Sequence, residues 1–406
     1  MKINKHCFPN GLRLVHYEDT STQMVALNIV YDVGARDEHP EHTGFAHLFE
    51  HLMFGGSAHI PDYDTPLQLA GGENNAWTNN DITNYYLTVP KPNVETAFWL
   101  ESDRMLELAF SEQSLEVQRG VVMEEFKQRC LNQPYGDVGH LFRPLAFRVH
   151  PYRWPTIGKE LSHIEQATLD EVKSFFYRFY APNNAVLAVT GNISWDETVK
   201  LTEKWFAPIP RRDVPVRQLP QEPEQTQERR LTVERNVPLD ALFMGYHMCS
   251  REGADYYAFD ILSDILSNGR SSRLNRRLVQ EQNIFSGIDA YISGTRDAGL
   301  LQISGKPAAG VSLEQAEAAV RKELEELQRS PVDGQELEKV KNKFESTQIF
   351  GNINYLNVAT NLAWFELTGK AEDIDLEVER YRSVTTEQLH TVAQRTFCES
   401  NAVVLY

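Results

Sequence analysis

Residues 25–38 read VALNIVYDVGARDE, an alternating and β-branched stretch that predicts a strand followed by a turn. Residues 240–253, DALFMGYHMCSREG, repeat this pattern 215 positions later, so that Tyr31 aligns with Tyr246. A spacing this large indicates an internal duplication rather than a short repeat.

The ends of the two halves also match, at an offset of 217. Residues 168–189 read TLDEVKSFFYRFYAPNNAVLAV and residues 385–406 read TTEQLHTVAQRTFCESNAVVLY; each predicts a helix, an Asn-containing turn and an apolar strand. We therefore predict an α+β fold of two homologous α/β halves, each a mainly antiparallel sheet packed with helices.

A proline-rich linker divides the chain almost in half. Residues 208–227 read PIPRRDVPVRQLPQEPEQTQ, and proline removes backbone donors and favours an extended chain. We predict a first domain at 1–207, a linker at 208–227 and a second, homologous domain at 228–406.

The composition is that of an acidic globular protein. Lys and Arg number 40 against 57 Asp and Glu, a formal net charge of -17, and such a surface repels phosphate backbones, which argues against a nucleic-acid partner. The first residues lack the apolar core of a signal peptide, and no apolar run is long enough to span a membrane. We expect no membrane association and a cytoplasmic location, although a processed periplasmic chain would have the same sequence.

Cysteine and histidine are distributed differently along the chain. The four cysteines form no CxxC pair, which argues against a thiolate metal site. Ten of the twelve histidines lie before residue 170. We therefore expect histidine chemistry in the first half.

A histidine pair lies in residues 44–57, GFAHLFEHLMFGGS, which predict a helix that ends at a Gly-Gly pair. His47 and His51 are four residues apart, so both imidazoles lie on one face of a helix and can bind a single metal ion. Imidazole suits zinc, and a catalytic zinc site keeps one position open. Glu50 lies next to that face, where a carboxylate can take a proton from water. HxxEH is the inverzincin motif.

The second half retains the packing positions of this helix but not its metal donors. Residues 258–271, AFDILSDILSNGRS, place Ile261 and Ile265 where His47 and His51 stand. The fold therefore does not require histidine at these positions.

A third ligand is expected in residues 118–129, QRGVVMEEFKQR, a helical stretch with Glu124 and Glu125 adjacent. Here the chain resembles the pitrilysin-like zinc peptidases, in particular the half-length branch that includes mitochondrial processing peptidase. The family's E-R-x-V-V-x-x-E pattern ends on a zinc-binding glutamate, so the resemblance implies that Glu125 binds zinc, with one Zn²⁺ per chain. Glu124 would then point about 100° away. The family's leading glutamate, which helps to orient the site, falls on Gln118, whose amide can still hydrogen-bond a ligand imidazole.

Residues 71–86, GGENNAWTNNDITNYY, resemble the family's G-G-x-x-N-A-x-T-x-x-D-x-T-x-Y strand. In relatives the substrate adds as an extended strand near it, a mode that suits peptides because main-chain hydrogen bonds supply the affinity. The resemblance implies that Asn75, Ala76, Trp77 and Thr78 bind substrate. The alternative is a polar strand with Asn-rich turns.

The second half departs from the family at a functional motif. Active relatives or their partner subunits resemble S-S-R-L-x-x-x-L-R-x-x-x-x-L-x-Y, whose later Arg and Tyr reach the scissile peptide. This chain has SSRLNRRLVQEQNIFS at 271–286, with Val279 in place of the Arg and Ser286 in place of the Tyr. Arg276, Arg277 and Phe285 could replace them only after a register slip. We therefore expect a heterodimer whose related partner subunit supplies Arg and Tyr; a homodimer is the alternative.

These features together predict a subunit of a zinc-dependent endopeptidase. His47, His51 and Glu125 are the predicted metal ligands, and Glu50 is the predicted general base. The resemblance implies a chamber, formed with a second subunit, that admits unfolded peptides. The alternative is a catalytically inactive scaffold or core subunit of the same fold, like the respiratory-complex core subunits, which usually lack the complete metal set.

Overall fold

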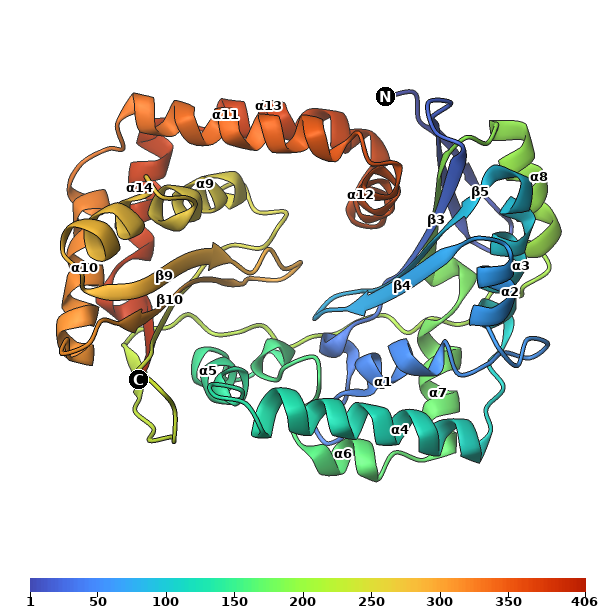
Figure 1. The fold of residues 1–406 in the computed structure, drawn as a ribbon, viewed down its shortest axis with the longest axis horizontal. Coiled ribbons are helices and arrows are strands. Elements are labelled where there is room, and N and C mark those ends of the chain that lie inside the picture. The colour runs from blue at the N-terminus through green and yellow to red at the C-terminus, as the bar shows by residue number, and fades with distance from the viewer. The chain divides into compact units, whose positions relative to one another are not determined.

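The computed structural model describes all residues from 1 to 406. The chain forms two compact units. The first comprises residues 1–131, 154–219 and 349–376, and the second comprises residues 132–153, 220–348 and 377–406. Each unit contains one β-sheet with helices packed on it (Figure 1). The predicted α+β class, with two mainly antiparallel sheets, is confirmed.

The first unit contains a six-stranded sheet. Its strands are β1 (Asn4–Cys7), β2 (Arg13–Glu18), β3 (Met24–Tyr31), β4 (Glu73–Thr78), β5 (Thr83–Pro90) and β6 (Ala185–Gly191). Their spatial order is β1-β2-β6-β3-β5-β4, and only the β2–β6 pair is parallel. Strand β4 therefore forms one edge of the sheet.

The second unit contains a five-stranded sheet of the same topology. Its strands are β7 (Arg229–Leu231), β8 (Leu242–His247), β9 (Phe285–Ile292), β10 (Leu300–Pro307) and β11 (Ala402–Leu405). Their order is β7-β11-β8-β10-β9, with only β7 and β11 parallel. Tyr31 pairs with Ala185 in the first sheet, and Tyr246 pairs with Ala402 in the second. Residues that are 215 positions apart (Tyr31 and Tyr246) therefore pair with residues that are 217 positions apart (Ala185 and Ala402), so the two sequence repeats form the same strand pair in each unit.

The helices complete both units. In the first unit they are α1 (Phe45–Leu52), α2 (Asp64–Leu69), α3 (Val94–Leu106), α4 (Glu112–Phe126), α6 (Leu161–Glu165), α7 (Leu169–Phe179), α8 (Trp195–Trp205) and α12 (Tyr355–Thr368). In the second unit they are α5 (Val138–Ala146), α9 (Tyr256–Ser267), α10 (Leu313–Arg329), α13 (Glu377–Ser383) and α14 (Thr386–Thr396), with most of α11 (Gly334–Gly351). No helix is long and apolar enough to cross a membrane.

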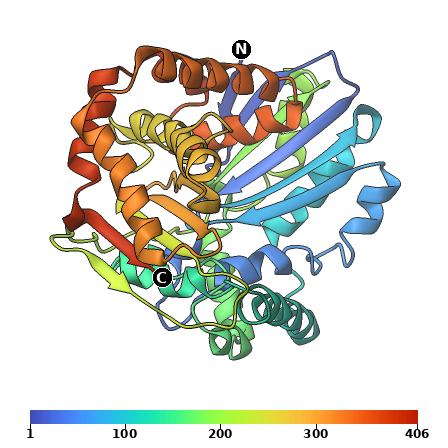
Figure 2. The ribbon, with the colours of Figure 1, turned by 60° about the vertical axis from the view of Figure 1, so that its left-hand side comes forward.

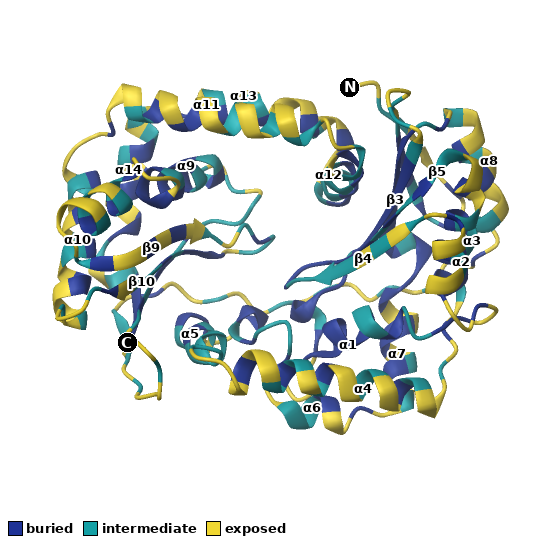
Figure 3. Ribbon diagram, in the orientation of Figure 1, coloured by how far each residue is buried: buried dark blue, intermediate teal, exposed yellow.

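Both faces of the first sheet are covered, because successive side chains of a strand point to opposite faces. In β3, Leu27 and Ile29 face a core that includes residues of α1, α3 and α7. On the opposite face, Ala26 and Val30 pack against α12, which lies beside β3 in two views (Figures 1 and 2). The central strands are accordingly buried (Figure 3).

The second sheet is covered in the same manner. One face packs against α9, α10 and α14, and the other packs against α5. Gly245 in β8 allows the close approach of α5, because a Cβ there would lie 2.7 Å from Cζ of Phe142. An added side chain would displace that ring.

Each unit takes one covering helix from the opposite half of the sequence. Helix α12 follows the second sheet in the chain but belongs to the first unit, and α5 precedes the linker but belongs to the second. Residues 211–226 contain neither helix nor strand. The compact units and the sequence halves therefore differ at these two helices.

Candidate metal centre

Helix α1 begins at a position that only glycine fits. Gly44 has a φ of 88°, and a Cβ there would lie 2.7 Å from Cδ1 of Ile164. The carboxylate of Glu38 accepts hydrogen bonds from the N–H groups of Gly44 (3.0 Å) and Ala46 (2.8 Å). These contacts determine where the helix that carries the histidines begins.

The other end of α1 lies against α4. Ser114 of α4 donates a hydrogen bond from Oγ to the carbonyl of Gly55 (3.1 Å). A Cβ on Gly55 would lie 2.6 Å from that Oγ, so glycine permits this approach. Leu48 and Phe49 bury the opposite side of α1 in the first core. The two helices therefore meet on the side that carries the histidines.

The structure brings the three predicted metal ligands together between α1 and α4. Oε2 of Glu125 lies 3.4 Å from Nε2 of His47 and 3.3 Å from Nε2 of His51. The imidazole centroids are 4.9 Å apart, and the rings are nearly perpendicular. Each residue offers a ligand atom, and these atoms all lie within 4.8 Å of one another.

The protonation states of two donors match what a metal ion requires. Burial lowers the pKa of His47 to about 4, so its imidazole is neutral at neutral pH. A hydrogen bond with His51 lowers the pKa of Glu125 despite partial burial, so its carboxylate is ionised. Neutral imidazole and ionised carboxylate are the ligating forms. Two nitrogens and one oxygen suit zinc.

The fold gains little from His47 as a packing residue. Its side chain is buried, and Nδ1 has no hydrogen-bond partner. A buried polar atom without a partner is costly and calls for an explanation. A metal ion bound through Nε2 would offset this cost, although it would not pair Nδ1 itself.

Glu50 lies beside this cluster and is partly buried. Burial raises the pKa of Glu50, whereas a hydrogen bond from Thr78 and the proximity of His51 lower it. Thr78 is the last residue of β4. The edge strand thus contacts the predicted general base directly.

The predicted substrate residues occupy the free edge of the first sheet. Asn75, Ala76, Trp77 and Thr78 lie on β4, which pairs with β5 on one side only. The N–H of Ala76 donates to Oδ1 of Asn75 (2.8 Å) rather than to β5. This N–H therefore points to the free edge of the sheet. There it is already hydrogen-bonded to the Asn75 side chain.

Two further sequence predictions concern α4. Gln118 is partly buried near Gly55, and it does not bond Nδ1 of His47, because that atom has no partner. Glu124 is exposed and forms an ion pair with Lys127 (2.6 Å). It thus faces away from the cluster.

Sequence reasoning missed Arg129. Its Nη1 lies 2.8 Å from Oε1 of Glu125, the carboxylate oxygen that does not face the imidazoles. The signal was present in the sequence, since an acid and a base four residues apart form ion pairs on a helix.

Val279 and Ser286 stand in the second unit at the positions that the resemblance assigns to Arg and Tyr. Val279 packs partly buried against the second core, and Ser286 bonds the carbonyl of Lys306. The possible substitutes are engaged elsewhere. Arg276 lies 3.6 Å from Glu281, Arg277 forms an ion pair with Glu323 (2.6 Å), and Phe285 is fully buried.

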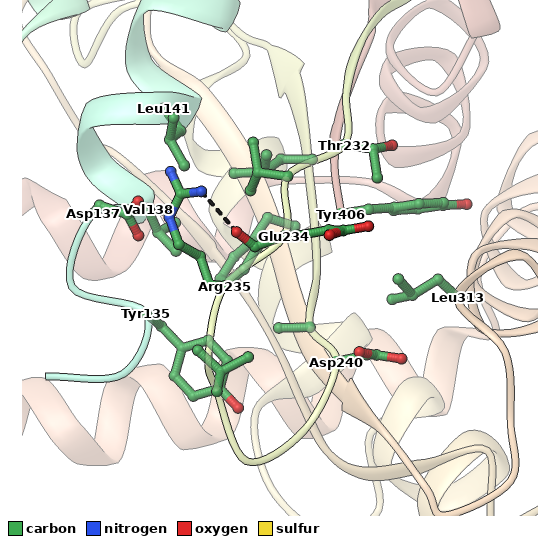
Figure 4. A pocket seen from close by; sticks show the side chains of 15 residues that line it. Tyr135, Asp137, Val138, Leu141, Thr232, Glu234, Arg235, Asp240, Leu313 and Tyr406 are labelled. Carbon is green, nitrogen blue, oxygen red and sulfur yellow. Dashed lines mark hydrogen bonds and ion pairs between the residues drawn. The ribbon is translucent and has the colours of Figure 1, made fainter.

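The second unit also contains a cavity of about 400 Å³. Val138 and Leu141 of α5 and Leu313 of α10 contribute to its apolar wall (Figure 4). Phe243 of β8 also lines the cavity. Asp137, which also lines it, is paired with Arg235 at 2.7 Å. The lining includes no histidine or cysteine, so this cavity suits a metal ion less well than the cluster of the first unit.

Comparison with known proteins agrees with this geometry. The family model described as insulinase (peptidase family M16) matches residues 13–137, and the model described as peptidase M16 inactive domain matches residues 166–344. The chain belongs to peptidase family M16. The resemblance to pitrilysin-like peptidases is thereby confirmed.

Two M16 relatives are named zinc proteases. The zinc protease PqqE of Helicobacter pylori is 29% identical over 338 residues, which cover 82% of this chain and 76% of the relative. The uncharacterized zinc protease YmxG of Bacillus subtilis is 25% identical over 406 residues, 99% of this chain and 98% of the relative.

Solved structures share the M16 fold. A protease from Helicobacter pylori superposes with a TM-score of 0.94 at 26% identity, covering 100% of this chain and 98% of that one. The periplasmic protease PqqL from Escherichia coli has a TM-score of 0.82 at 19% identity; the match covers 100% of this chain but 47% of PqqL.

Proposed function

We propose that the chain is the metal-bearing subunit of a zinc-dependent endopeptidase that hydrolyses unfolded peptides. The cluster of His47, His51 and Glu125 carries this proposal, because its ligand atoms lie within 4.8 Å of one another. These residues would hold one Zn²⁺ ion and leave a further position open. The names of the zinc-protease relatives support the same metal.

Glu50 would move the proton in this reaction. A bound zinc ion supplies a Lewis acid that polarises a carbonyl and makes water more acidic. The Glu50 carboxylate takes a proton from the attacking water and later gives it to the amine of the leaving peptide. Burial raises the pKa of Glu50 above its ordinary value, and a raised pKa favours the use of one carboxyl group first as base and then as acid. Thr78 holds the carboxylate in place.

The substrate would bind as an added strand along β4. The edge lies next to α1, and Asn75, Ala76, Trp77 and Thr78 would line the bound peptide. Main-chain hydrogen bonds do not depend on side-chain identity, so this mode accepts many unfolded sequences but few folded ones.

A second, related subunit would complete the active site. Val279 and Ser286 stand where the resemblance places Arg and Tyr, and Arg277 is held by Glu323. The chain also spans about half of PqqL, covering 47% of it. We therefore propose a heterodimer whose partner supplies Arg and Tyr. Full peptidase turnover by the purified chain alone, as a monomer or homodimer, would contradict this arrangement.

Zinc content and one substitution test the enzyme itself. Protein purified without chelators should carry about one zinc ion per chain. Glu50→Gln should keep that zinc and lose about 10²- to 10⁴-fold in turnover, because the general base is absent. Glu124→Gln, an exposed carboxylate on α4, is the matched control and should retain activity. Absence of zinc would instead favour a non-enzymatic scaffold, whereas an active Glu50→Gln would refute the role of Glu50 as the general base.

A further inference from the structure

The helix that carries Glu125 changes its winding just after that residue. Helix α4 ends at Phe126, and Lys127–Leu131 form a π-helical turn. Such turns are rare and occur frequently at functional sites. Within this turn, Nη1 of Arg129 lies 2.8 Å from Oε1 of Glu125.

The two oxygens of Glu125 consequently have different neighbours. Oε1 faces the Arg129 guanidinium at 2.8 Å, whereas Oε2 lies 3.4 Å from Nε2 of His47 and 3.3 Å from Nε2 of His51. The carboxylate is thus oriented with one oxygen toward the arginine and the other toward the imidazoles. Free rotation of the carboxyl group would exchange these roles.

We propose that Arg129 is a positioning residue that restricts Glu125 to a single metal-binding oxygen. This inference rests on the proposed function, because it assigns zinc to the cluster. A carboxylate can offer one or both oxygens to a metal ion. With both oxygens bound, the three side chains would fill four positions, and none of the usual tetrahedral positions would remain for water or substrate.

The contact of Arg129 with Oε1 of Glu125 and the positive charge of Arg129 act in opposite directions on zinc binding. The contact, at 2.8 Å, orients the ligand, and partners of this kind typically change metal affinity by about 10- to 100-fold. The positive charge repels a cation and draws electron density from the carboxylate. Because the Arg129 side chain is 66% exposed, its replacement leaves the core of the unit unchanged. A set of substitutions can therefore separate the two effects.

Three variants and one control make the test. Arg129→Met removes both the donor and the charge, Arg129→Gln keeps a neutral donor, and Arg129→Lys keeps the charge with a different donor geometry. Lys127→Met is the matched control, because Lys127 lies in the same turn but pairs with Glu124. Zinc affinity is measured by competition with a chromogenic chelator, and coordination number by the visible absorption of the cobalt-substituted protein.

Arg129→Met should bind zinc about tenfold more weakly, and its cobalt form should show the weaker absorption of a five-coordinate ion. Arg129→Gln should restore much of the wild-type spectrum, and Lys127→Met should match wild type. A wild-type spectrum in Arg129→Met, with zinc affinity unchanged or tighter, would overturn the positioning role. Wild-type protein that binds no zinc would refute the proposed function itself.

Discussion

Ile261 of α9 stands at the position in the second unit that His47 of α1 holds in the first. The strands that precede these helices, β3 and β8, pair equivalently with β6 and β11. Ile261 is 1% exposed and packs in the second core. His47 is also buried, but its Nδ1 has no hydrogen-bond partner. The duplication thus shows which residue the fold alone favours at this place.

His47→Ile is therefore expected to fold and to lose zinc. The zinc-free variant should be as stable as zinc-free wild type or more so, because a buried unpaired polar atom costs about 1–3 kcal/mol. Zinc should raise the melting temperature of wild type, through binding to the native state, but not that of the variant. Thermal unfolding with and without zinc measures both effects.

His51→Ile is the comparison variant for this experiment. His51 is partly exposed and bonds Glu125, so its removal should abolish zinc binding without a gain in zinc-free stability. If His47→Ile failed to fold while His51→Ile folded, the equivalence between α1 and α9 would be wrong.

Glu38→Ala should loosen the start of α1. Loss of the carboxylate leaves the buried N–H groups of Gly44 and Ala46 without acceptors, at a cost of about 1–3 kcal/mol for such an unsatisfied group. Because α1 carries two of the three ligands, zinc affinity should fall as well. Glu38→Gln keeps one acceptor oxygen, so its stability and its zinc affinity should lie between those of wild type and Glu38→Ala. Chemical unfolding and chelator competition measure the effects, and unchanged zinc affinity in a destabilised Glu38→Ala would contradict the coupling.

The duplicated sheets could be predicted from the sequence because their pairing is repeated locally. Tyr31 and Tyr246, at an offset of 215, pair with Ala185 and Ala402, at an offset of 217. The exchange of α12 and α5 could not be predicted in this way. An apolar face, such as that of Leu362, shows that a helix is covered but not which of two similar sheets covers it.

Some features of the candidate site could also be predicted from the sequence, and others could not. The pairing of His47 with His51 follows from helical spacing alone. Glu125 lies far along the chain, and only resemblance to a family distinguished it from Glu124. The spacing of Glu125 and Arg129 indicated an ion pair, but nothing in the composition marks the π-helical turn from which Arg129 reaches Glu125. The Thr78 contact with Glu50 depends on tertiary packing of β4 beside α1.

Ala76→Pro should weaken peptide binding to β4. Proline removes the N–H that points to the free edge, and edge strands tolerate proline better than central strands do. Asn75→Ala should act in the opposite direction, because it removes the side chain that occupies this N–H. Both are measured as binding of a labelled unfolded peptide to the zinc-loaded Glu50→Gln protein, which does not consume it. Equal peptide affinity in Ala76→Pro and in its parent, with zinc retained, would exclude strand addition at this position.

Glu317 connects three elements of the second unit. Its carboxylate accepts two hydrogen bonds from Arg230 (2.8 Å each), one from Arg321 (2.6 Å) and one from the hydroxyl of Tyr406. Burial alone would raise the pKa of Glu317, but these hydrogen bonds outweigh it and lower the pKa to about 2. Unfolded glutamate has a pKa of about 4.3. The ionised carboxylate therefore stabilises the fold above the unfolded pKa.

This contribution should be lost as the pH falls from about 4.3 towards 2, since the unfolded chain then binds a proton that the native chain still excludes. Glu317→Gln should be less stable than wild type at neutral pH but should lose less stability over this interval. Glu325→Gln, whose surface ion pair with Arg329 contributes little, is the control on the same helix. Urea unfolding at a series of pH values measures the difference, and parallel pH profiles for wild type and Glu317→Gln would show that the network does not lower this pKa.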